Sequence, residues 1–79
     1  MSNKPIPEQH LKRFEYLSSF LRELRLNEGL TQEELSQQIN LHRNSIIRAE
    51  NARNMTLISL FELADALNIS PKELFLDVE

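Results

Sequence analysis

The segment NLHRNSIIRAEN, residues 40–51, carries side chains that can bond to phosphates and to the edges of planar bases. Residues 40–53 contain three arginines and one glutamate, whereas residues 54–79 contain one lysine and five acids. Ile46 and Ala49 stand three residues apart, which predicts a helix with an inward apolar side and an outward polar side. A locally basic helix therefore stands in the middle of a chain whose net charge is -3.

Composition excludes several kinds of chemistry. The 79 residues include no cysteine, so no disulfide, thiolate nucleophile or zinc–cysteine site can form. The two histidines lack acids at ligand spacing, and we expect no metal ion, cofactor or small-molecule ligand. Paired carboxylates, a glycine-rich phosphate loop and an activated nucleophile are all missing, so we do not expect an enzyme. No apolar run approaches the roughly 18 residues of a membrane span and no secretory signal is present, which predicts a cytoplasmic protein without membrane contact.

Helical periodicity dominates the rest of the chain, and no segment alternates like a strand. We predict five helices in one all-α domain, at about residues 8–28, 32–39, 43–51 and 57–67 and from residue 71 onward. The first helix has an apolar stripe at Leu11, Phe14, Leu17, Leu21 and Leu24. The inward stripe of the fourth helix is expected at Leu57, Leu60, Ala64 and Leu67.

Local signals mark the ends of these helices. Thr31 can cap the second helix while Glu34 bonds back to it, a capping box that recurs at residues 70–73. Gly29, Asn40 and Asn68 are expected in the left-handed conformation that commonly follows a helix end. A turn of about three residues then separates the second helix from the third, which is the spacing of a helix-turn-helix.

The stretch from Leu21 to Phe75 resembles the Cro and phage-repressor type of helix-turn-helix domain, also called the XRE type. The matching segments are LRELRLNEGLTQEEL, NSIIRAEN and TLISLFELADALNISPKELF. The resemblance implies a compact five-helix lambda-repressor-like fold and a DNA-binding regulator of transcription. We place the helix-turn-helix domain at residues 17–79, after an N-terminal extension, residues 1–16, that continues into the first helix.

The resemblance also implies which residues meet double-stranded DNA when the third helix enters the major groove. Base contacts are expected from Arg43, Asn44, Ser45, Ile47 and Arg48. Phosphate contacts are expected from Gln32, His42, Asn51, Arg53 and Thr56. Arg25 and Glu50 match a structural ion pair of the family. His42 stands where the family usually has a serine or threonine cap, so either the helix is capped less well or His42 itself reaches the backbone.

Apolar residues beyond the needs of one core predict a homodimer. The expected interface consists of Ile58, Phe61, Phe75, Leu76 and Val78. A twofold dimer would place two reading helices about one helical turn of DNA apart and would require a palindromic operator. Glu33 is a candidate contact with RNA polymerase, as in some phage activators, although an acid also suits the start of a helix.

Three kinds of regulator fit the resemblance: a restriction-modification controller, a Cro-like switch and an antitoxin, and controllers look closest in size and layout. No sensor domain follows the helix-turn-helix, so we expect autoregulation. The alternative is a protein–protein interaction module that keeps the fold and uses an exposed Ile47 to bind its partner.

Overall fold

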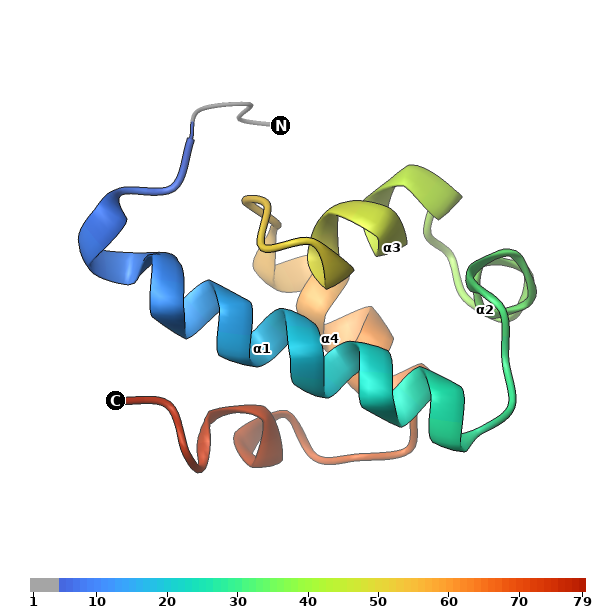
Figure 1. Ribbon diagram of the computed structural model, residues 1–79. Helices are drawn as coiled ribbons and strands as arrows, with labels where there is room; N and C mark the ends of the chain where they lie inside the picture. The colour runs from blue at the N-terminus through green and yellow to red at the C-terminus, as the bar shows by residue number, and fades with distance from the viewer. Residues whose placement is uncertain (1–4) are drawn as a thin grey trace.

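The computed structural model describes residues 5–79 and contains four α-helices and one 3-10 helix, with no strand in that range. The elements are α1 (Glu8–Asn27), α2 (Gln32–Gln38), α3 (Arg43–Glu50), α4 (Leu57–Ala66) and η1 (Pro71–Phe75). The all-α class is confirmed, and the predicted fifth helix is the 3-10 helix η1. In Figure 1 the long α1 crosses the molecule, with α2 and α3 above it, α4 behind it and η1 below it. No helix within residues 5–79 is long and apolar enough to cross a membrane.

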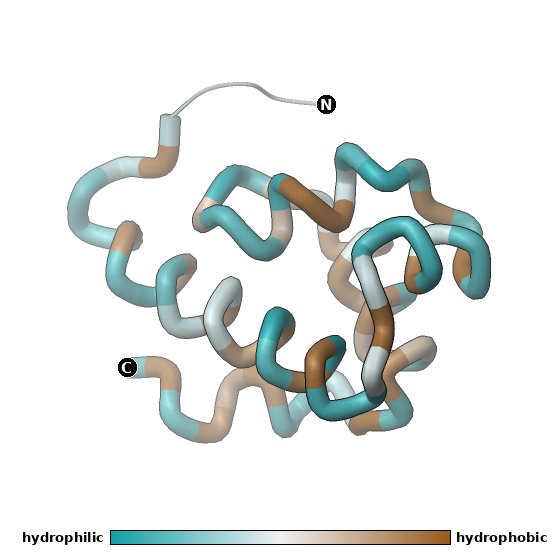
Figure 2. The backbone as a smooth tube through the Cα atoms, turned by 45° about the vertical axis from the view of Figure 1, so that its right-hand side comes forward, coloured by the Kyte–Doolittle hydropathy of each residue, from teal (hydrophilic) through white to brown (hydrophobic). Residues whose placement is uncertain are grey.

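The core forms where all five elements meet. Its largest fully buried side chains come one from each element: Leu21, Leu35, Ile46, Leu63 and Leu74. Burial of one such side chain contributes about 2 kcal/mol, and isolated helices as short as α2 and α3 are marginal in water. The short helices are therefore held by this shared core. Figure 2 shows the apolar stripe of α1 as brown stretches that return between teal ones along the helix.

α1 follows the predicted stripe only over its second half. The helix begins at Glu8 as predicted, and Leu17 and Leu21 are buried in the core. Leu11 is exposed, because the first turns of α1 extend beyond the region where the other elements meet. Gly29 follows the helix with a φ of +71°, which confirms its left-handed conformation.

The first turns of α1 contact the last described residues of the chain. The Tyr16 hydroxyl donates to the Asp77 carboxylate at 3.1 Å, and the Arg13 Nε donates to the backbone carbonyl of Glu79. Partial removal from water raises the pKa of Tyr16, and the hydrogen bond to Asp77 raises it further. α1 runs unbroken across the expected boundary at residues 16 and 17, and residues 1–4 of the expected extension lie outside the described residues.

The start of α2 is fixed by the predicted capping box. The Glu34 N–H donates to the Thr31 hydroxyl at 3.0 Å, and the Thr31 N–H donates to the Glu34 carboxylate at 2.9 Å. The bond from the Thr31 backbone also lowers the pKa of Glu34, with a smaller contribution from the Thr31 side chain. The capping box is confirmed, and it sets the point at which the chain enters the helix-turn-helix.

The turn between α2 and α3 differs from the expectation at Asn40. α2 ends at Gln38, and Ile39 is extended with φ -130° and ψ 164°. Asn40 does not have a positive φ, so the prediction of a left-handed residue there is wrong. The turn after α2 is formed by Ile39 and Asn40 instead, with Ile39 extended and its side chain packed against the core.

α4 has its predicted cap but not its full predicted stripe. The Thr56 hydroxyl accepts the backbone N–H three residues further on at 3.1 Å. Leu60 and Ala64 are buried, whereas Leu57 is 66 % exposed, so its assignment to the core is wrong. Leu57 is the first residue of α4 and lies beyond the edge of the core, whereas Leu63, which was not in the predicted stripe, is buried.

The chain reaches η1 through a left-handed residue and a second capping box. Asn68 has a φ of +66°, which confirms the conformation expected from the sequence. Ser70 and Glu73 form the capping box, and Pro71 occupies the first turn. η1 is a 3-10 helix of five residues, and the fully buried Leu74 anchors it in the core.

Candidate nucleic-acid interface

α3 has one side locked into the core and the other turned outward. Ile46 and Ala49 are both 0 % exposed. With 3.6 residues per turn, the positions opposite these two point away from the core. The five residues expected to contact bases are the exposed Arg43 and Asn44 and the half-buried Ser45, Ile47 and Arg48. The core thus anchors α3 through residues different from those on its free side.

His42 caps α3 through its own ring. Its Nδ1 accepts the backbone N–H of Asn44 at 3.1 Å, which settles the alternative left open by the sequence in favour of a histidine cap. A ring nitrogen that accepts a hydrogen bond carries no proton, so in the neutral ring the proton is assigned to Nε2. The His42 side chain is exposed at the start of α3.

A bidentate ion pair fixes the other end of α3 to α1. The Arg25 guanidinium donates to the two carboxylate oxygens of Glu50 at 2.7 and 3.0 Å, and the side chains are 9 % and 4 % exposed. Arg25 also donates to the Leu30 carbonyl at 2.7 Å, and the Gln32 amide donates to Glu50 at 3.1 Å. The hydrogen bond to Glu50 raises the pKa of Arg25, against the smaller opposing effect of burial. The ion pair expected from the resemblance is present. Glu50 also accepts a bond from Gln32, so the same carboxylate links α1, α2 and α3.

A buried serine, which was not predicted from the sequence, forms a second link between α1 and the end of α3. The Ser18 hydroxyl donates to the Ala49 carbonyl at 2.6 Å and accepts the Ala52 N–H at 2.8 Å. Ala52 follows α3 with a φ of +53°, a conformation that usually favours glycine or asparagine. The one available signal is a small polar residue, Ser18, beside the apolar stripe of α1.

Three of the expected phosphate contacts lie at or after the end of α3. Asn51 donates from its side-chain amide to the Ile47 carbonyl at 2.6 Å, and Thr56 uses its hydroxyl to cap α4. Arg53 is exposed, and its backbone N–H donates to the Arg48 carbonyl at 3.1 Å. The structure therefore places Arg53 outward, while Asn51 and Thr56 also serve the backbone of the protein.

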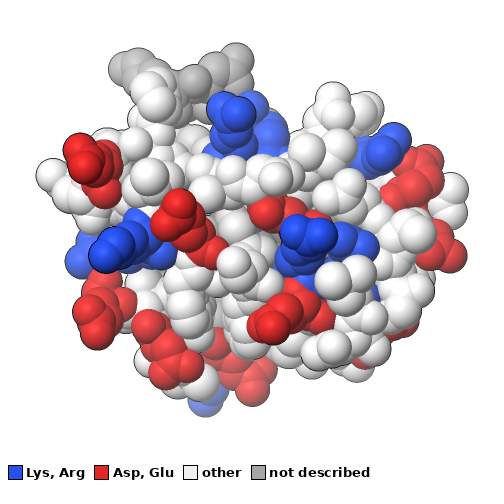
Figure 3. Space-filling view, viewed as in Figure 1, with Lys and Arg blue, Asp and Glu red and all other residues white. Residues whose placement is uncertain are grey.

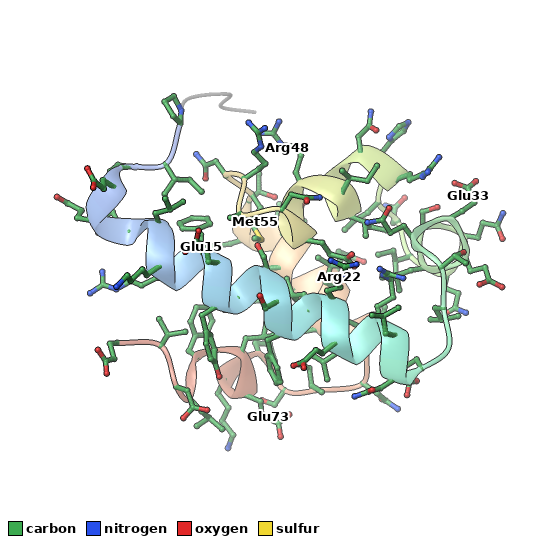
Figure 4. All side chains as sticks on the ribbon, in the orientation of Figure 1. Glu15, Arg22, Glu33, Arg48, Met55 and Glu73 are labelled. Carbon is green, nitrogen blue, oxygen red and sulfur yellow. The ribbon has the colours of Figure 1, made fainter. Side chains whose placement is uncertain are left out.

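The two arginines of α3 differ in how they are held. The Arg43 Nε lies 3.8 Å from the Glu33 carboxylate, and both side chains are more than half exposed. Such an exposed ion pair contributes about 0–1 kcal/mol. Arg43 can therefore exchange Glu33 for another partner at little cost. Arg48 is half-buried and donates to the Asn54 carbonyl at 3.3 Å. Figure 4 shows Arg48 rising from α3 away from α1.

Charge is distributed unevenly over the face shown in Figure 3. Lysine and arginine groups stand along the upper edge, above α3 in the matching view of Figure 1, and the lower edge is mostly acidic. Figure 3 also shows basic groups at the left edge and near the middle of this face, so the cations above α3 are one group among several on a chain of net charge -3.

The expected dimer residues divide into exposed and partly buried side chains. Ile58 and Leu76 are each 72 % exposed, and Phe61 and Phe75 are nearly half exposed. Val78 instead packs against the core and is only partly accessible. Four of the five expected dimer residues therefore face outward, and Leu57 of α4, which was not among them, is exposed as well.

A short helix with an outward polar side, joined by a tight turn to a preceding helix and braced against a long first helix, defines the helix-turn-helix class of DNA-binding folds. The helix-turn-helix family model matches residues 21–74. The chain belongs to this family, in its XRE type. A comparison with curated proteins yields no match.

Solved structures with similar folds include three regulators. The restriction-modification controller protein C.AhdI from Aeromonas hydrophila is 38 % identical over 81 % of this chain and 98 % of that protein, with a TM-score of 0.75. The hypothetical transcription factor NHTF from Neisseria is 31 % identical over 94 % of this chain and 82 % of that one, with a TM-score of 0.71. A mutant of C.Esp1396I bound to its highest-affinity operator site is 34 % identical over 80 % of this chain and 84 % of that one, with a TM-score of 0.70.

Proposed function

We propose that this DNA-binding transcriptional regulator reads a palindromic operator as a homodimer, with α3 of each subunit in the major groove. The observation that carries the proposal is the division of α3, whose inward residues are fully buried while Arg43 and Asn44 are exposed at its first turn. The N-terminal residues of a recognition helix are those that reach base edges. The reading surface is therefore positioned before DNA arrives.

Each proposed base contact follows from side-chain chemistry. Arg43 and Arg48 can each donate two hydrogen bonds to guanine, and Asn44 can pair with adenine. Ser45 can bond to either kind of base edge, and the methyl groups of Ile47 can contact a thymine methyl. One good bidentate contact discriminates against a wrong base by about 1–3 kcal/mol.

The proposed phosphate contacts surround the reading surface. Gln32 offers an amide beside its bond to Glu50, His42 offers its Nε2–H, and Arg53 offers an exposed guanidinium. Asn51 and Thr56 are proposed as weaker contacts. Contacts to phosphates orient the protein on the duplex but carry no sequence information of their own.

The controller, Cro-like and antitoxin roles share autoregulation, and the controller role has the most support. C.AhdI and C.Esp1396I are restriction-modification controller proteins, and both resemble this chain at more than 30 % identity. Contact of Glu33 with RNA polymerase is part of the proposal, because its carboxylate is exposed at the first turn of α2. No catalytic step is proposed.

The test combines site selection with one substitution. Selection of bound duplexes from a random pool should recover a palindrome, and Arg43→Ala should reduce the preference for one base of each half-site by about 5- to 150-fold. Lys72→Ala, an exposed residue of η1, is the control and should leave the preference unchanged. Equal sequence preference in wild type and Arg43→Ala would exclude α3 as the reading helix.

Assembly is tested separately from DNA reading. Sedimentation of the free protein at micromolar concentration should show a dimer, and Phe61→Glu should shift it toward monomer by placing a charge in the apolar patch. The patch consists of Ile58, Phe61, Phe75, Leu76 and the partly buried Val78. A wild-type protein that remains monomeric under these conditions would contradict the proposed interface.

A further inference from the structure

A hollow of about 700 Å³ opens where α1, α2 and α3 meet. Its lining includes Gln32, Arg43 and Asn51, which the proposed function assigns to DNA, and also Arg22 of α1, which it does not. Arg22 precedes Arg25 by three residues and shares its side of α1, the side that is bonded to the end of α3. In Figure 4 Arg22 lies in front of α1, on the part of the helix nearest to α3.

Two acids, Glu33 and Glu50, also line the hollow, and Arg22 forms an ion pair with neither, since Glu33 lies near Arg43 and Glu50 pairs with Arg25. The residues three and four positions away on α1 are Ser18, Ser19, Arg25 and Leu26. Across the hollow, Glu50 already accepts hydrogen bonds from Arg25 and Gln32 with its two carboxylate oxygens. Among the described residues 5–79, Arg22 has no ion-pair or hydrogen-bond partner, and it is exposed.

The groups at this hollow suit one oxygen-rich anion. Arg22 and Arg43 bring guanidinium groups and Gln32 brings a side-chain amide, all of which donate to phosphate oxygens. We propose that Arg22 is a further DNA-binding residue, which donates to a backbone phosphate at this hollow and adds one contact per subunit from outside the α2–α3 motif. This inference rests on the proposed function.

A purely structural role for Arg22 has a different signature. A cation close to the carboxyl end of α3 would stabilise that helix by interaction with its dipole. Its removal would then lower the Tm of the free protein and leave the number of neutralised phosphates unchanged. The salt dependence of DNA binding separates the two roles, because its slope counts phosphate contacts.

The experiment measures Kd against salt concentration for the duplex recovered by selection. The variants are Arg22→Gln, Arg22→Lys and the matched control Lys12→Gln, which removes an exposed cation of α1 that lines a different hollow with Asp77 and Glu79. Each lost phosphate contact lowers the slope of log K against log salt by about 0.9, so Arg22→Gln should flatten the slope for a dimer by about 2. It should also weaken binding about tenfold at low salt, because charge-assisted contacts are the strong ones. Arg22→Lys should keep the slope, and Lys12→Gln should match wild type.

A second measurement uses the wild-type protein with modified DNA. Methylphosphonate, which removes the charge of one phosphate, is placed at each backbone position of a half-site in turn. At one position the substitution should weaken binding of wild type but not of Arg22→Gln. The inference is overturned if every position affects both proteins equally, or if Arg22→Gln lowers only the Tm and keeps the wild-type slope.

Different results would contradict the proposed function and the assignment of Arg22. If wild type shows neither sequence preference nor salt-dependent binding, the proposed function itself is wrong. If wild type binds with a base preference that requires Arg43, and Arg22→Gln has the same slope and affinity, only the assignment of Arg22 is wrong.

Discussion

Replacement of Glu50 by glutamine should strongly destabilise the domain, although it conserves the size of the side chain. The carboxylate of Glu50 accepts two hydrogen bonds from Arg25 and one from Gln32. A glutamine amide presents one acceptor oxygen and one donor group, so part of this set must be lost. Arg25 would then keep a nearly buried charge with neutral acceptors only, the Leu30 carbonyl and at most one bond to the new amide oxygen.

The magnitude follows from the burial of the pair. Removal of one partner from a buried ion pair costs about 3–5 kcal/mol, and the lower end applies here because the amide oxygen can still accept one bond. In a domain of this size each kcal/mol lowers the Tm by about 4–8 °C, so Glu50→Gln should lower it by about 12–24 °C. The loss affects α1, α2 and α3 together, since all three supply a residue to the network.

Thermal and urea unfolding, followed by circular dichroism, measure this loss. Glu23→Gln, at an exposed carboxylate of α1, is the matched control and should stay within about 0.5 kcal/mol of wild type. Replacement of both Arg25 and Glu50 by methionine should cost less than Glu50→Gln alone, because no buried charge is left unpaired. A loss below about 1 kcal/mol for Glu50→Gln would refute the network. Strict additivity of Arg25→Met and Glu50→Met in the double variant would refute it as well.

Three other substitutions test the ends of the reading helix and the cap of α2. Ala52→Gly should raise the free energy of unfolding in urea by about 0.5–1 kcal/mol, since it relieves a left-handed alanine, and a decrease would contradict that strain. Ser18→Ala should lower it by about 2 kcal/mol, because the buried Ala49 carbonyl loses its partner; an effect under about 0.5 kcal/mol would show that the bond is dispensable. Glu34→Gln should destabilise near neutral pH but not in acid: the folded-state pKa of Glu34 lies below its ordinary 4.5, so its contribution is present above that value and is lost as pH falls through the lower one. A stability gap between Glu34→Gln and wild type that stays constant from about pH 7 to pH 3 would contradict this cause.

Signals that act over a few residues allowed most helix boundaries to be predicted. Thr31 with Glu34, and Asn68 before η1, act through bonds and backbone angles within one turn, and the structure contains both. The same reasoning fails at Asn40, because the packing of Ile39 against distant residues sets the backbone there. The predicted burial of Leu57 is wrong for a related reason, because helical periodicity does not show where the core ends.

The side-chain bonds that link one helix to another were harder to predict than the helices themselves. The bonds from Ser18 reach residues 31 and 34 positions away, and no local pattern reports a partner at that distance. The pair of Arg25 with Glu50, 25 residues apart, was expected only through the resemblance to a family. Outward exposure of Arg43 and Asn44 followed from helix periodicity once Ile46 and Ala49 were placed inward.

The residues that attach α3 to the rest of the protein differ from those that are exposed on it, and this separation affects how such a regulator can change its DNA target. Ile46, Ala49 and Glu50 tie the helix to its scaffold, whereas Arg43 and Asn44 make no contribution to the core. If Arg43 and Asn44 make the proposed base contacts, exchange of these two side chains should leave folding almost untouched and alter the favoured half-site. Duplicated copies of such a gene can diverge to serve separate promoters without passing through an unstable intermediate.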